Sequence, residues 1–174
     1  EYSKKMIEEF WSEEEGMFFD TGQNSTDTLI RPSTSQDNIF PSGISVACEV
    51  LIKLSRIFGK SSYEDIARSQ VKSSSSDILK FPAAHCNWAS LLGDNSYNRQ
   101  LVIAGDDISE LLFAGNIHLD KELVFGFGKD GRGYFISEGK KEENDLATAY
   151  YCENYSCLEP VNSAEELLSQ MENS

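Results

Sequence analysis

Two cysteines near the end of the sequence, Cys152 and Cys157, are the residues whose side chains are most suited to chemistry. Their four-residue gap differs from the two-residue gap of a thioredoxin-type redox motif. On a straight strand two residues five positions apart face opposite sides, whereas a turn through Asn154 and Tyr155 would bring the two sulfurs together. Three interpretations therefore stay open: packing or turn cysteines, a reversible disulfide, and metal ligands.

A structural zinc site needs four ligands, which usually come as two closely spaced pairs. The remaining Cys and His residues lack that paired spacing: Cys48, His85, Cys86 and His118. No Ser–His–Asp or Cys–His arrangement follows from the spacing either, so we expect both histidines in ordinary surface or core positions. We predict neither a metal site nor a cofactor.

A second group of polar residues in the first third of the chain could line a ligand pocket: Asp20, Arg31, Asp37, Ser42 and Glu49. Arg31 precedes a proline in a long polar loop, and loops carry function more often than cores do. Arg31 and Asp37 could form a bidentate ion pair that orients the loop, or could bind a polyhydroxyl or carboxylate ligand. We favour the structural ion pair.

A glycine-rich run, Gly126-Phe-Gly-Lys-Asp-Gly131, formally matches a dinucleotide-binding fingerprint. That motif needs a helix directly after it to receive the pyrophosphate, whereas residues 132–136 are typical of a strand. We therefore interpret Asp130-Gly131 as a hairpin turn.

Helical periodicity predicts the elements that hold the polar group. We expect an amphipathic helix over residues 2–12 and a polar loop over 23–38. Pro41 is expected in the first turn of a helix that ends at Gly59.

A second helix would run from about residue 62 to 79, behind a capping box of Ser61 and Glu64. Its end would be weakened by the serines at 73–76, whose hydroxyls compete for the backbone. The tight turn between the two helices predicts a helical hairpin.

After Pro82 the pattern changes to short strands and helices. We expect short helices near 84–92 and 107–114, and a terminal helix capped by Ser163 and Glu166. Strands are predicted at 100–104, 123–127, 134–136 and 148–151.

The charge of the chain excludes some classes of partner. The formal net charge is −14, and the acids are concentrated at the two ends. Nucleic acid binding needs a clustered basic face, so we predict no nucleic acid partner. No stretch has the roughly 20 apolar residues of a membrane span, and we predict no membrane contact. Four cysteines in 174 residues are too few for a disulfide scaffold, which favours a reducing, cytoplasmic location.

Several segments together resemble one protein family, and they stand in the order expected near its C-terminus. They are Gly16-Met-Phe-Phe-Asp-Thr21, Arg31-Pro32, Pro41-Ser-Gly-Ile-Ser-Val-Ala47 with Glu49 and Leu51, and Ala149-Tyr-Tyr-Cys-Glu-Asn-Tyr-Ser-Cys157 with Pro160-Val161. The chain is similar to thioredoxin-domain-containing proteins of the YyaL type, which include the spermatogenesis-associated thioredoxin-like protein. One departure is Ile44, which stands where the family pattern leads us to expect Asn.

The resemblance implies an N-terminal thioredoxin-like domain followed by an (α/α)6 toroid, most of which would lie outside this chain. By analogy with sugar epimerases and six-hairpin glycosidases, the five polar residues would lie near the mouth of the toroid cavity. The resemblance also implies that Cys152 and Cys157 are a family mark rather than the redox centre.

These observations predict an α+β fold, in which partial (α/α) toroid hairpins precede a small α/β unit with three or four strands. The helical part would cover residues 1–95 and the α/β unit residues 96–174. We expect the apolar faces near Trp11, Phe58 and Trp88 to be uncovered.

The function expected for this chain is that of a non-catalytic C-terminal portion that packs against the remainder of the parent protein or another copy of itself. The alternative is part of a carbohydrate-active toroid enzyme, an isomerase, epimerase or glycoside hydrolase, with a sugar ligand in the full-length protein.

Overall fold

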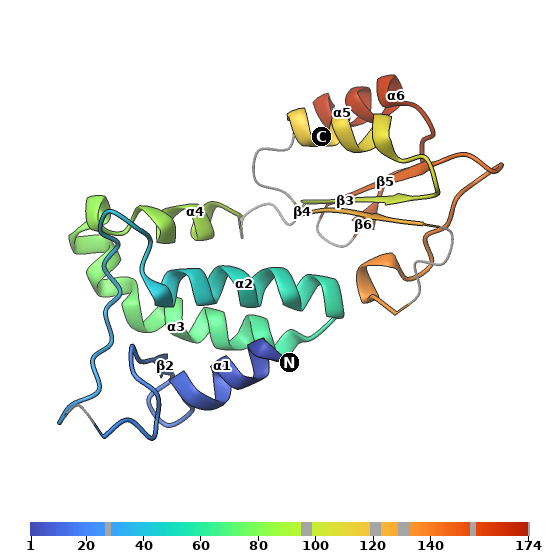
Figure 1. Ribbon diagram of the computed structural model, residues 1–174. Coiled ribbons are helices and arrows are strands. Elements are labelled where there is room, and N and C mark those ends of the chain that lie inside the picture. The colour runs from blue at the N-terminus through green and yellow to red at the C-terminus, as the bar shows by residue number, and fades with distance from the viewer. Residues whose placement is uncertain (27–28, 95–98, 119–122, 129–132, 154–155, 174) are drawn as a thin grey trace. The chain divides into compact units, whose positions relative to one another are not determined.

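The computed structural model describes residues 1–174 except residues 27–28, 95–98, 119–122, 129–132, 154–155 and 174. The chain divides into two compact units, Glu1–Leu92 and Gly93–Ser174. Helices and two small sheets make up its regular structure (Figure 1), and the predicted α+β class is confirmed. None of the helices in the described ranges is both long and apolar enough to span a bilayer.

The first unit is built on a helical hairpin of α2 (Gly43–Phe58) and α3 (Ser61–Lys80) (Figure 1). Gly59 ends α2 in the left-handed conformation, with φ 65°, and its N–H donates to the carbonyl of Ser55. Glycine adopts this conformation without a steric penalty, which explains the tight reversal of the chain.

The hairpin is completed by shorter elements: α1 (Tyr2–Phe10), the strands β1 (Trp11–Ser12) and β2 (Met17–Phe18), the 3-10 helix η1 (Pro82–Ala84) and α4 (Cys86–Asp94). Its core includes Leu51 and Cys48 of α2, Ala67 of α3 and Trp88 of α4, all fully buried. Trp11 also packs into this core. The expectation of uncovered faces at Trp11 and Trp88 is therefore wrong, whereas Phe58 is 44% exposed.

Three details at the ends of α2 and α3 differ from the predictions. Pro41 precedes the N-cap Ser42 and so lies outside the first turn of α2. Lys60 is the N-cap of α3 and makes no side-chain cap, because Gly59 ends one helix immediately before the next begins; the predicted capping box is absent. Glu64 pairs instead with Arg68, one turn along the same helix.

The serines of α3 do not shorten it. Ser73 and Ser75 donate to backbone carbonyls three residues earlier, at Gln70 and Lys72, and the helix continues to Lys80. Hydroxyls that bond back to their own helix leave its hydrogen-bond ladder in place.

The second unit holds a four-stranded sheet of order β4-β3-β5-β6. Its strands are β3 (Arg99–Ala104), β4 (Leu123–Phe127), β5 (Thr148–Glu153) and β6 (Ser156–Cys157). β3 pairs parallel with β4 and antiparallel with β5, and β6 pairs antiparallel with β5. The parallel pair is connected through α5 (Ser109–His118), as a crossover connection requires.

One face of this sheet packs on α5 and α6 (Ala164–Glu172), which lie together over the strands in Figure 1. Leu101, Ile103, Ala149 and Tyr151 point to these helices and are fully buried. Ser163 caps α6 by accepting from the N–H of Glu166, and the predicted cap is confirmed.

Strand alternation places Val102, Phe125, Tyr150 and Cys152 on the opposite face. Phe125 contacts the ring of Tyr134 there, with centroids 5.3 Å apart. The predicted strand at residues 134–136 is wrong, because Phe135–Ser137 form a 3-10 helix, η2, in which Ile136 is buried. The predicted hairpin turn at Asp130-Gly131 lies outside the described residues.

Candidate functional site

Two of the five predicted polar residues, Asp37 and Ser42, lie together at the start of α2. Ser42 is the N-cap, and its hydroxyl accepts from the N–H of Ser45 at 3.1 Å. The Asp37 carboxylate accepts from the N–H of Ser42 at 2.8 Å through Oδ1, and from the N–H of Asn87 at 2.8 Å through Oδ2. Asn87 lies in the first turn of α4. Asp37 thus binds N–H groups at the starts of two helices, groups that have no partner within a helix.

Arg31 does not pair with Asp37. Its guanidinium donates to the carbonyl of Thr21, at 2.8 Å from Nη2 and 3.3 Å from Nε, and lies 4.2 Å from the ring centroid of Phe19. Nη2 also approaches the carbonyl of Glu9 at 3.4 Å. The favoured ion pair is therefore wrong, since both side chains are described and each has other partners. Arg31 instead fastens the polar loop to the residues around β2.

Asp20 and Glu49 complete the predicted group. Asp20 accepts from the N–H of Thr34 at 3.0 Å, so it too holds the loop. Glu49 lies one turn before Lys53 on α2 and pairs with it at 2.6 Å. The structure thus brings Asp37 and Ser42 together, whereas Arg31 and Glu49 each have separate partners.

The first unit has two hollows near these residues. One, of about 260 Å³, is lined by Met6, Phe10, Phe18, Phe19, Asp20, Gly43, Ile44 and Ala47. The other, of about 350 Å³, is lined by residues 37–41 together with Cys86, Asn87 and Ser90. Aromatic rings dominate the first hollow, with Asp20 as its charged residue.

Sequence reasoning missed buried polar residues that hold this region together. His85 is fully buried; its Nδ1 lies 2.8 Å from the carbonyl of Phe81 and its Nε2 lies 3.2 Å from the hydroxyl of Ser35. Because a carbonyl only accepts, Nδ1 carries a proton. Gln70, also buried, accepts from the N–H of Phe18. Neither pairing has a signal in the spacing of these residues along the chain.

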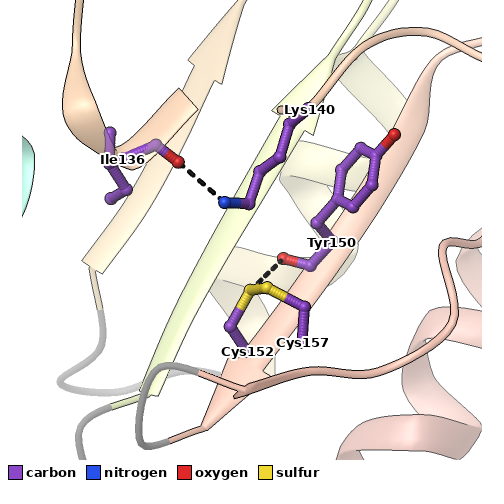
Figure 2. Close-up of a disulfide and its surroundings, with 5 residues drawn as sticks. All are labelled: Ile136, Lys140, Tyr150, Cys152 and Cys157. Atoms are coloured by element: carbon purple, nitrogen blue, oxygen red, sulfur yellow. Dashed lines mark hydrogen bonds between the residues drawn. A yellow bond between two sulfur atoms is a disulfide. The ribbon is translucent and has the colours of Figure 1, made fainter. Parts of the chain in front are cut away.

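In the second unit, Cys152 and Cys157 form a disulfide (Figure 2). The two residues are direct partners across β5 and β6. Of the three interpretations left open by the sequence, the structure contains the disulfide. The Cys152 sulfur lies 3.8 Å from the carbonyl oxygen of Tyr150.

Lys140 belongs to the surroundings of this disulfide (Figure 2). Its ammonium donates to the carbonyl of Ile136 at 2.9 Å, and burial lowers the pKa of Lys140 below its ordinary value. The hydroxyl of Tyr150 donates to the carbonyl of Lys141 at 2.7 Å, which holds this segment against β5.

An acidic hollow of about 300 Å³ in the second unit is lined by Asp106, Asp107, Glu110, Leu111, Glu142, Asp145, Leu146, Ala147 and Asn162. Among the described residues, no group of three or more His, Cys, Asp or Glu is placed to hold a metal ion. The side chain of His118 and residues 129–132 of the glycine-rich run lie outside the described part of the chain.

In comparisons with protein-family models, curated proteins and solved structures, nothing matches this chain.

Proposed function

We propose that this chain is a non-catalytic portion of a YyaL-type thioredoxin-domain-containing protein, and that its first unit binds the remainder of that protein through α2. The observation that carries the proposal is the pair of valines on the outer face of α2. Val46 and Val50 are 40% and 41% exposed, one turn apart, on the side opposite the buried Leu51 and Cys48.

The outer face of α2, defined here as Val46, Glu49, Val50 and Lys53, combines two apolar residues with one ion pair. Ile39 and Phe40, just before the helix, are more exposed still, at 90% and 79%. A helix that is apolar on two sides is typical of an array in which each hairpin packs between two neighbours. The proposed occupant is therefore a neighbouring helical hairpin of the parent protein.

The hydrogen-bond partners of the polar residues also support a binding role over a catalytic one. Asp37 accepts from backbone N–H groups at two helix starts, and Arg31 donates to backbone carbonyls. Side chains engaged in this way position the loop between β2 and α2, and general acid–base catalysis would require them to face a substrate. The proposed location is the cytoplasm, where free thiols such as Cys86 persist.

The variant V46E/V50E tests the proposal, and its matched control is K72E/S76E, which places two carboxylates one turn apart at exposed positions of α3. Binding to the purified remainder of the parent protein is measured by sedimentation velocity. We expect V46E/V50E to weaken binding by at least about tenfold, because two carboxylates would have to be desolvated at the contact. K72E/S76E should bind like the wild type. Equal binding by all three proteins, self-association in place of binding, or no binding at all would contradict the proposal.

One observation favours a second candidate, a sugar-binding role. The 260 Å³ hollow combines the rings of Phe10, Phe18 and Phe19 with the carboxylate of Asp20, and ligand pockets typically join an apolar lining to a few polar groups. A sugar-binding screen on the full-length protein separates the two functions. Binding that is lost in D20N would support the sugar role, and no binding to any sugar would exclude it.

A further inference from the structure

The two cysteines of the disulfide differ in their exposure to solvent. Cys152 is 3% exposed and lies in β5, which pairs on its other side with β3. Cys157 is exposed and lies in β6, a two-residue strand at the edge of the sheet. An incoming thiolate attacks a disulfide along the S–S bond and needs access to one sulfur. Of the two cysteines, Cys157 is the exposed one, and we therefore assign the attack to its sulfur.

The segment that carries Cys157 is also held by bonds other than the disulfide. The N–H of Leu158 donates to the carbonyl of Tyr151 at 2.9 Å. Ala149 and Val161 exchange two backbone hydrogen bonds, of 2.8 and 3.0 Å. These bonds do not involve the sulfurs, so the chain beyond β6 can stay on the sheet when the S–S bond is broken.

A cationic side chain, Lys140, lies on the same side of the sheet as the disulfide (Figure 2). Figure 2 shows Lys140 on the side of β5 that carries the Tyr150 side chain and the disulfide. An ammonium in a partly buried position stabilises a nearby thiolate, which makes the sulfur a better leaving group.

From these features we propose that Cys152–Cys157 is a thiol–disulfide exchange site whose substrate is a dithiol reductant. A thiolate of the reductant attacks Sγ of Cys157, the S–S bond breaks, and Cys152 leaves as a thiolate that takes up a proton. The second thiol of the reductant then attacks the mixed disulfide and releases the Cys157 thiol. Two electrons pass to the protein, and the reductant becomes a disulfide.

The test is the rate at which dithiothreitol reduces the disulfide in the full chain, followed by trapping with a maleimide and mass spectrometry. The measurement uses the variant C86S, which lacks the exposed free thiol. The thiol of the buried Cys48 is labelled only after unfolding and is subtracted from the total. We expect the rate in native buffer to be within about tenfold of the rate in denaturant, because Cys157 is already accessible. A native rate lower by more than about tenfold would overturn the proposal, because the folded protein would then protect the disulfide from the reductant.

A second measurement tests which of the two sulfurs the reductant attacks. In the C86S background, the Cys157 thiol left by C152S should react with an aromatic disulfide at least about tenfold faster than the Cys152 thiol left by C157S, because Cys157 is exposed and Cys152 is buried. Equal rates would contradict the assignment of Cys157.

For Lys140, the readout is the pH at which alkylation of the reduced protein reaches half its maximal rate. We expect K140M to raise that pH and K141M, one residue along, to leave it unchanged. If the pH of half-maximal alkylation were the same in K140M and K141M, Lys140 would have no part in the exchange site.

Discussion

Asp37 connects two helix starts that are 45 residues apart in sequence, Ser42 and Asn87, through one carboxylate. In D37N one of the two oxygens becomes an amide nitrogen, which would face a backbone N–H as donor against donor. We expect the free energy of unfolding to fall by about 1–3 kcal/mol, the cost of leaving such a group unpaired. Urea denaturation measures it, with D65N on the exposed side of α3 as control. The control should change by less than about 0.5 kcal/mol, and an equally small change in D37N would contradict this role.

Cys48 makes the stability of the first unit depend on pH in the alkaline range. Burial raises the pKa of this thiol from 9.0 to about 12. The unfolded chain therefore loses the proton near pH 9, whereas the folded chain keeps it until about pH 12. The free energy of unfolding is unaffected below pH 9, and above it falls by about 1.4 kcal/mol per pH unit.

The matched variant for this effect is C48A, which lacks the titrating group. Urea denaturation from pH 8 to 11 should give a steeper decline for the wild type than for C48A. Parallel declines would contradict the assignment, whatever constant offset the smaller side chain causes.

The residue contacts were the part of the site that the sequence could least predict. Arg31 and Asp37 are close in sequence and opposite in charge, which suggested an ion pair. Their actual partners are backbone groups. Backbone N–H and carbonyl groups are the same in nearly all residue types, so the sequence does not indicate which of them a side chain will bind. Likewise, Cys152 and Cys157 face each other because of the register between β5 and β6. The spacing of the two cysteines does not reveal that register, so the disulfide was only one of three interpretations.

Among the elements, the junction after β3 depends on one glycine. Gly105 has φ +132°, and a Cβ there would lie 2.9 Å from the Cα of Ala147. We expect G105A to lower the free energy of unfolding by about 2–3 kcal/mol, from backbone strain and this contact. In the control G43A nothing lies within 4 Å of the added Cβ, so a neutral or slightly stabilising effect is expected in the helix. Thermal unfolding of both variants checks this, and similar melting temperatures would contradict it.

The sequence predicted the helices and strands that show a clear pattern of apolar or β-branched residues. It did not predict the elements whose conformation depends on tertiary contacts. The apolar periodicity of residues 44–58 and the β-branched run at 100–104 correspond to α2 and β3. Residues 134–136 have strand-like composition, yet Tyr134 packs on Phe125 and the chain turns into η2. β6 was missed because two residues are too few to show alternation.

At the scale of the whole molecule, each of the two units has its own apolar core. The helical hairpin of the first unit fits the toroid that the resemblance implies, and that membership stays a proposal. A single hairpin buries only one side of α2, which leaves Val46 and Val50 on its outer face. We propose that this face binds another part of the parent protein.

The most direct test is a methyl NMR titration of the valine-labelled chain with the purified remainder of the parent protein. Val102, fully buried in the second unit, serves as the internal reference. We predict that the Val46 and Val50 signals shift or broaden on binding while the Val102 signal does not. Unchanged Val46 and Val50 signals, or changes confined to other valines, would contradict the claim.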